Sequence, residues 1–160
     1  MGKLSGFKHR VQGRCSNTLC SVSCFFCKGE SALLLVTNNE KVRDQYGSLC
    51  TLEFVDGGHV DVLTHVRDLV HSGHKLLTHP LAGSVKPNET PFRSVALTEE
   101  AGPLDLESLD LIEAALGVCR QFKPRFHRGD DAPADMREDF AEIDFRLIHG
   151  AIAPHLQKGE

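Results

Sequence analysis

Six side chains suited to gripping or transforming a small anion lie close together between residues 79 and 93. They are His79, Ser84, Lys86, Asn88, Glu89 and Arg93. Backbone N–H groups at Gly83 and Ser84, together with the Ser84 hydroxyl, are able to face an anion. Lys86 supplies a point charge, and Arg93 supplies a fork that matches the two oxygens of a carboxylate or phosphate. This composition predicts a ligand-binding loop.

The connection that carries these side chains is long and stiff. Most connections between elements have about 4–6 residues, and much longer ones are usually functional or disordered. Pro87 and Pro91 fix their own φ angles and hold the preceding residues extended, which argues against disorder. We therefore expect a binding role, while a loop shaped by its prolines for structure alone remains the alternative.

Catalysis is the sharper hypothesis for the same loop. Histidine is the side chain whose pKa normally lies near neutrality, so His79 is the candidate acid, and Glu89 is positioned in the sequence to orient it or to act as a base. No nucleophile–base pair follows from spacing alone. The sequence therefore leaves open whether the protein is an enzyme.

Alternating apolar strands and amphipathic helices surround the loop. Apolar runs predict strands at 33–36, 50–55, 75–78 and 93–98, and helical periodicity predicts helices at 40–46, 60–71 and 106–122. A last helix is expected after Asp131 and Pro133, where Met136, Phe140, Ile143 and Leu147 repeat at helical spacing. We predict an α/β domain over 32–150, with a small, mainly parallel sheet of about four strands flanked by helices, a C-terminal helix, and a frayed tail at 151–160.

Three polar segments should meet at the carboxyl ends of the predicted strands, where ligands bind in such sheets. One is the loop from His79 onward, one is the turn at 56–58, and one is the run Thr37, Asn38 and Asn39. Because Asn38 and Asn39 stand at the start of a predicted helix, their N–H donors are expected to help hold an anion. The predicted ligand-binding residues are therefore Thr37, Asn38, Asn39, Gly83, Ser84, Lys86, Asn88 and Arg93.

Composition narrows the class of protein. The 160 residues have 41% hydrophobic and 25% charged content and a formal net charge of −4, which is ordinary for a globular domain and gives no basic surplus for nucleic acid. No apolar run approaches the ~20 residues of a membrane span, or the roughly 7–15 of a signal peptide. We expect a cytoplasmic protein that contacts neither nucleic acid nor membrane.

Residues 1–31 differ from the rest of the chain. They hold five Lys or Arg against one acid, and four of the six cysteines: Cys15, Cys20, Cys24 and Cys27. We expect a disordered basic extension, with a misassigned start site as one explanation of the abrupt change in composition. Four thiolates at this spacing are also able to hold zinc or an iron–sulfur cluster, so metal binding stays open for this segment; elsewhere we expect neither metal nor cofactor.

Histidines are dense between 59 and 79. His65 and His71 are six residues apart on one predicted helix, so they point about 240° apart and cannot share a metal. We expect His59, His65, His71 and His74 on the surface.

Three strings resemble the GrdX-type proteins, small proteins associated with glycine, sarcosine and betaine reductase systems. They are TNN at 37–39, GHKLLTHPLAGSVKPNETPFRSV at 73–95 and LDLESLDLIE at 104–113, so the resemblance covers about residues 32–122. It implies an accessory protein whose candidate partners are reductase subunits, and it implies no catalytic residues. The leading hypothesis is such a protein, binding a small anionic ligand or a reductase subunit through the 79–93 loop. The rival is a small enzyme acting on an amino-acid-derived or phosphorylated metabolite, with His79 and Glu89 as acid and base.

Overall fold

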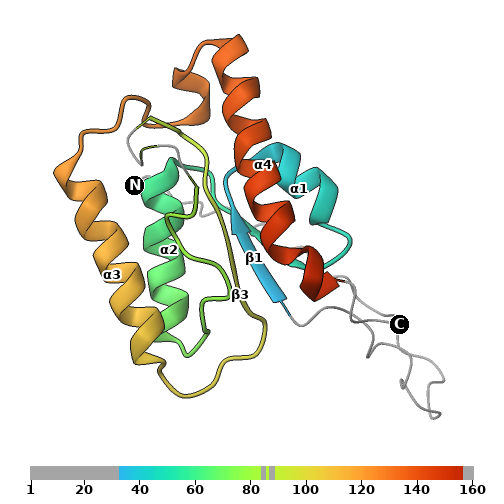
Figure 1. Cartoon of the computed structure of the whole chain (residues 1–160), viewed down its shortest axis with the longest axis vertical. Helices are drawn as coiled ribbons and strands as arrows, with labels where there is room; N and C mark the ends of the chain where they lie inside the picture. The colour runs from blue at the N-terminus through green and yellow to red at the C-terminus, as the bar shows by residue number, and fades with distance from the viewer. Residues whose placement is uncertain (1–32, 84–85, 87–88, 157–160) are drawn as a thin grey trace, which may run out of the picture.

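The computed structural model describes residues 33–83, 86 and 89–156, and it has three strands and four α-helices (Figure 1). In chain order these are β1 (Leu33–Thr37), α1 (Glu40–Tyr46), β2 (Thr51–Phe54), α2 (His59–His71), β3 (Ser94–Thr98), α3 (Leu106–Gln121), a short 3₁₀ helix η1 (Gly129–Asp131) and α4 (Ala134–Leu156). The predicted α/β class and the C-terminal helix are confirmed.

The sheet is smaller than predicted, and it is mixed. Its strand order is β2-β1-β3, with β1 parallel to β2 and antiparallel to β3. The expected sheet of about four mainly parallel strands is therefore wrong in both number and direction. A parallel return from residue 78 to residue 94 would need a crossover connection, usually a helix, and the described residues of this stretch form none.

The segment 75–78, predicted as a strand, runs beside the outer edge of β3 without forming a regular ladder. A single antiparallel bridge joins Leu76 to Leu97. Around it the Leu77 N–H donates to the Ala96 carbonyl (2.9 Å) and the Thr98 N–H donates to the Lys75 carbonyl (2.9 Å). The 79–93 loop therefore connects two neighbouring antiparallel segments.

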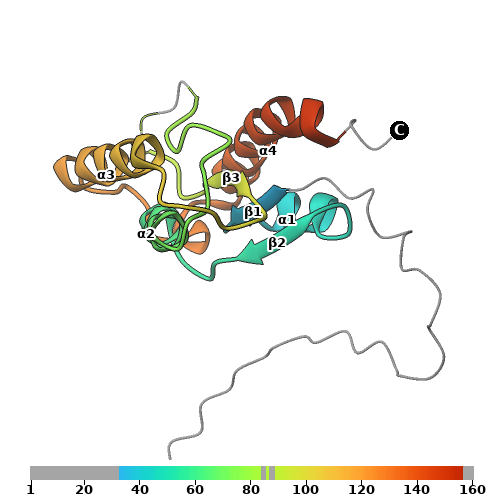
Figure 2. The ribbon, with the colours of Figure 1, turned by 90° about the horizontal axis from the view of Figure 1, so that it is seen from below.

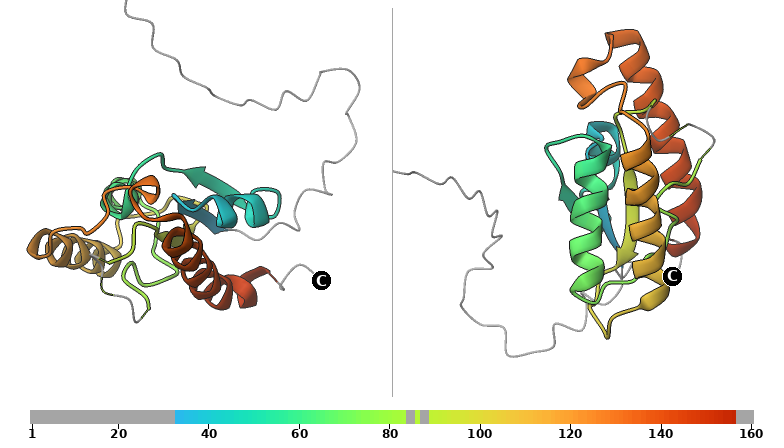
Figure 3. Two further views of the ribbon diagram at one scale, coloured as in Figure 1. Left: turned by 90° about the horizontal axis from the view of Figure 1, so that it is seen from above. Right: turned by 90° about the vertical axis from the view of Figure 1, so that its left-hand side faces the viewer.

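Helices cover both faces of the sheet, so β1 is buried at every position. Because successive side chains of a strand point to opposite faces, those of β1 enter two separate cores. Figures 2 and 3 show α2 and α3 side by side on one flank and α1 and α4 on the other. The buried side chains of the first core are Leu34, Val36, Val62, Leu63, Val66, Val70, Val95, Leu97, Ile112, Leu116 and Cys119. Those of the second are Leu33, Leu35, Val42, Tyr46, Ala96, Ile148 and Ile152.

Local signals in the sequence fix the ends of several helices. The Asp105 side chain accepts from the Ser108 N–H (3.0 Å) and begins α3, as predicted. Gly73 follows α2 with a φ of 103°, a conformation that glycine adopts without strain, and the next residue, His74, donates back to the Leu69 carbonyl (3.1 Å).

The last helix is confirmed, but the side chains that it buries are not the apolar residues whose spacing predicted it. Asp144, Ile148 and Ile152 are the buried side chains of α4, whereas Ile143 and Leu147 are 40% and 38% exposed. The helix also continues past Gly150 to Leu156, into the predicted tail. None of the described helices has the length and apolar character needed to cross a membrane.

Candidate anion-binding site

The side chain of Asn38 holds the three predicted polar segments together. Its Nδ2 donates to the carbonyls of Gly57 (2.9 Å) and Pro91 (2.8 Å), and its Oδ1 accepts from the N–H of Arg93 (2.8 Å). The convergence expected at the carboxyl end of β1 is therefore present. Because both amide hydrogens are used within the protein, Asn38 positions the backbone of this site.

Asn39 is similarly occupied. Its Oδ1 accepts from the Lys41 N–H (3.1 Å) and so caps α1, while its Nδ2 donates to the Ala141 carbonyl (2.9 Å) and to Asp144 Oδ2 (3.0 Å) on α4. Its role in the structure is to attach α4 to the end of β1.

A buried hydrogen-bonded chain of side chains continues from this point. The Ser94 hydroxyl donates to Asp144 Oδ2 (2.7 Å) and lies 2.7 Å from the Thr37 hydroxyl. The Thr37 oxygen accepts from the Asn39 N–H (3.0 Å). Burial raises the pKa of Asp144, although the hydrogen bonds from Asn39 and Ser94 and the charge of Arg93 act in the opposite direction.

Arg93 is the most unusual group of the site, because it is a guanidinium that is only 5% exposed. Its Nη1 donates to the Ala82 carbonyl (3.0 Å). This hydrogen bond joins the last residue of the 79–93 loop to a residue near the start of the same loop. Its Nε is buried and has no hydrogen-bond partner, and no carboxylate of the described residues lies within ion-pair distance. Burial lowers the pKa of Arg93 and Asp144 opposes that shift, but an arginine stays charged.

His59, the first residue of α2, is 2% exposed, so its predicted surface position is wrong. Burial, followed by the nearby charge of Arg93, lowers the pKa of His59 from 6.5 to about 4, while Asp61 acts in the opposite direction. The imidazole is therefore neutral at physiological pH.

Two clefts open at this edge of the sheet. The larger has a volume of about 550 Å³ and extends from Asn38 and Phe92 to the start of α4. The smaller, about 400 Å³, lies between His59 and His127. Arg128 lines both clefts, and its side chain donates to the Asp56 carbonyl (3.1 Å).

Several predicted residues of the loop do not belong to this buried cluster. His79, Gly83 and Lys86 are exposed, and Glu89 is half-buried. The His79 ring accepts from the Leu81 N–H (3.1 Å), which closes a local turn. The acid–base hypothesis for His79 and Glu89 stays a prediction. Two further predicted residues, Ser84 and Asn88, lie outside the described residues.

The metal hypothesis concerns a part of the chain that the structure does not describe, since Cys15, Cys20, Cys24 and Cys27 all fall there. Among the described residues, no group of three or more His, Cys, Asp and Glu side chains is arranged to hold a metal ion.

Sequence reasoning missed Ser94, Asp144 and His59, although two of them had a periodic signal. His59 lies three residues before Val62, on the buried stripe of α2, and Asp144 lies four residues before Ile148, on the buried stripe of α4. Ser94 had no such signal, and its partner Asp144 is 50 residues away in the sequence.

The fold and the site define a small three-layer α/β protein with a buried, incompletely paired arginine at the carboxyl edge of its parallel strands. The chain belongs to the GrdX-like protein family, whose model matches residues 34–153. This confirms the resemblance and extends it beyond residue 122, and family membership suggests an association with glycine reductase-type systems. Comparison with curated proteins gave no match, and neither did comparison with solved structures.

Proposed function

We propose that the protein is a cytoplasmic accessory component of a glycine, sarcosine or betaine reductase system, and that it binds a small carboxylate at Arg93 beneath the 79–93 loop. The family supports the cellular setting. The ligand-binding part of the proposal depends on the pairing of Arg93.

The observation that carries the proposal is the buried, unpaired edge of the Arg93 guanidinium. Nη1 is bound to the Ala82 carbonyl, whereas neither Nε nor Nη2 donates to an acceptor in the described part of the chain. A buried charge without full hydrogen bonding costs several kcal/mol. An anion that accepts from this edge supplies both the missing hydrogen bonds and the counter-charge.

A carboxylate fits this edge better than other small anions. Nε–H and one Nη–H point in parallel and match the two oxygens of a carboxylate. Arg93 is the one buried cation among the described residues of the site, Asp144 contributes a nearby carboxyl group, and His59 is neutral at physiological pH, so the electrostatics favour a ligand that presents one carboxylate to Arg93. The compounds after which these reductases are named, glycine, sarcosine and betaine, each carry one carboxylate beside a positively charged nitrogen.

The exposed part of the loop is the proposed contact for a reductase subunit. His79 and Lys86 are exposed there, on a segment anchored at its base by Asn38 and Arg93. Ligand binding below the loop and subunit binding above it would then act through the same element.

Thermal unfolding of the full chain with added betaine tests the ligand, with choline as the matched compound that lacks a carboxylate. A ligand that binds only the folded state stabilises it by about 1.4 kcal/mol at ten times its dissociation constant. We expect betaine to raise the melting temperature and choline to leave it unchanged. An equal response to the two compounds would exclude carboxylate recognition.

Two variants assign that response to a residue. Arg93→Gln should abolish the betaine effect, and Arg93→Lys, which keeps the charge without the fork, should weaken it. Arg128→Gln removes an exposed arginine at the same edge and should leave the effect intact. Retention of the full effect in a folded Arg93→Gln protein would refute the assignment. Binding of Lys86→Ala to purified reductase subunits tests the subunit contact separately, and undiminished binding would refute it.

A further inference from the structure

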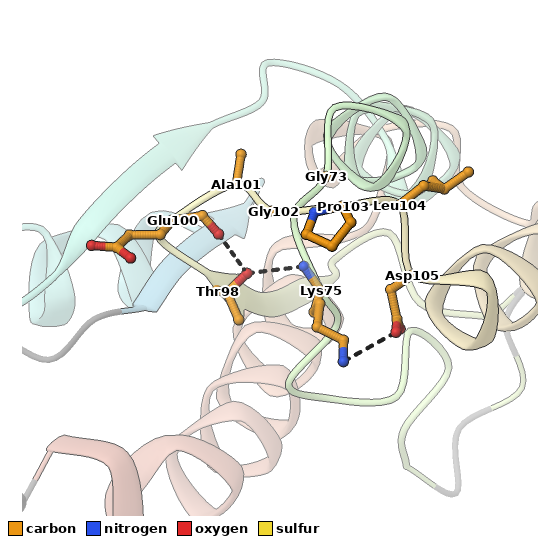
Figure 4. A pocket seen from close by; sticks show the side chains of 9 residues that line it. All are labelled: Gly73, Lys75, Thr98, Glu100, Ala101, Gly102, Pro103, Leu104 and Asp105. Carbon is orange, nitrogen blue, oxygen red and sulfur yellow. Dashed lines mark hydrogen bonds and ion pairs between the residues drawn. The ribbon is translucent and has the colours of Figure 1, made fainter.

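A groove of about 440 Å³ lies at the opposite end of the sheet, where β3 ends and α3 begins (Figure 4). Two of its lining residues form an ion pair, with Lys75 Nζ 3.0 Å from Asp105 Oδ1. The lining residues are Gly73, Lys75, Thr98, Glu100, Ala101, Gly102, Pro103, Leu104 and Asp105.

Backbone contacts hold the walls of this groove in place. The Gly102 N–H donates to the Gly73 carbonyl (2.8 Å), and a side chain at Gly73 would overlap the Gly102 carbonyl oxygen. The Thr98 hydroxyl accepts from the Lys75 N–H (2.9 Å) and donates to the Glu100 carbonyl (3.0 Å). The groove is therefore a formed surface feature of the fold.

The surface around the groove combines apolar and acidic side chains. Leu104 is 47% exposed, and Leu106, at 68%, is the most exposed large apolar side chain of the described residues. Residues 98–107 contain four acids, Glu99, Glu100, Asp105 and Glu107, and no basic residue. A basic segment that carries large apolar side chains complements this surface.

The chain itself contains such a segment, and that segment enters the described structure beside the groove. Leu33, the first described residue, is paired in register with Thr98, which lines the groove. The preceding residues 1–31 hold five Lys or Arg against one acid. Phe25, Phe26 and Lys28 lie five to eight residues before Leu33, a reach of up to about 26 Å at ~3.3 Å per residue.

We infer that residues 25–28 of the same chain dock on this groove. The two phenylalanines cover the exposed Leu104 surface, and Lys28 meets the carboxylate of Glu100. This contact uses the opposite end of the sheet from Arg93, so it stands or falls independently of the carboxylate site.

Photo-crosslinking of the full chain tests this docking. Benzoylphenylalanine is placed at Leu104, and the products are identified by mass spectrometry of a mixture of ¹⁴N- and ¹⁵N-labelled protein, which distinguishes links within one molecule from links between two. We expect links from position 104 to residues 20–31 of the same molecule. The matched control is the same group at Phe122, which is 48% exposed at the other end of α3 and should give no such links.

The outcomes separate the possible occupants of the groove. Lys28→Glu should reduce the yield from position 104 several-fold, while Lys3→Glu, far from the docking stretch, should leave the yield unchanged. Links mainly between ¹⁴N and ¹⁵N molecules would assign the groove to a second copy and overturn the proposal. The proposal is also overturned if residues 20–31 give no links from position 104, or if Lys28→Glu leaves the yield unaltered.

Discussion

The buried imidazole of His59 predicts a loss of stability in mild acid. Its pKa is about 4 in the folded protein, compared with 6.5 as its ordinary value, so the unfolded chain binds a proton that the folded chain resists. The associated stability is fully present above pH 6.5 and is lost as the pH falls toward 4. From these two values, the free energy of unfolding should fall by about 2 kcal/mol between pH 7.5 and 5.0 because of this one group.

Urea denaturation of the wild type and of His59→Gln at several pH values isolates this contribution. The buried carboxyl of Asp144 has a raised pKa, so its contribution to stability changes with pH in the opposite direction to that of His59. That contribution is common to both proteins and cancels in the difference. The difference should change by about 2 kcal/mol over this pH range.

His71→Gln is the matched control, since it removes an exposed histidine at the other end of the same helix. Its stability should follow the wild-type pH dependence. Parallel curves for the wild type and His59→Gln would refute the burial of a neutral imidazole at the start of α2.

Three further substitutions test the packing that positions the site. Asn38→Ala should cost about 2–4 kcal/mol in urea denaturation, because the carbonyls and the N–H that the amide satisfies lose their partners, and a cost below 1 kcal/mol would contradict its linking role. Gly73→Ala should lower the melting temperature by several degrees, because its φ is 103° and a Cβ would meet the Gly102 carbonyl. Gly102→Ala is the control and should leave the melting temperature unchanged, because the space around Gly102 is open. Similar shifts in the two variants would contradict the local geometry. Ile152→Ala should cost about 2–5 kcal/mol and Ile143→Ala less than 1 kcal/mol, and the reverse order would contradict the observed buried face of α4.

The meeting of Asn38 with the loop was predictable because it depends on one rule about strands. Polar residues that follow buried apolar runs lie at the carboxyl edge of the sheet, and this placed Thr37, Asn38 and the turn at 56–58 together. The direction of β3 was also open to inference, since no helix separates residue 78 from residue 94 to carry a parallel crossover. The spacing of apolar residues alone does not indicate whether β3 is parallel or antiparallel to β1.

The chemistry inside the site depends on contacts that sequence spacing does not encode. Arg93 was predicted as an anion ligand from its type, but its burial depends on where α2, α3 and α4 converge. Asp144 and Ser94 meet across 50 residues of chain, and only the docking of α4 on β3 brings them together. For Asn39, the same docking uses the amide hydrogens that the sequence suggested for a ligand.

The most direct test of the central claim observes the Arg93 Nε–H itself. In ¹⁵N-labelled full-length protein, the resonance missing from Arg93→Lys identifies this group, and betaine is then titrated against it. The carboxylate site predicts a saturable shift of that resonance with betaine and no shift with choline. An Arg93 Nε–H that stays unchanged while betaine saturates the protein, or a protein that betaine does not bind at all, would contradict it.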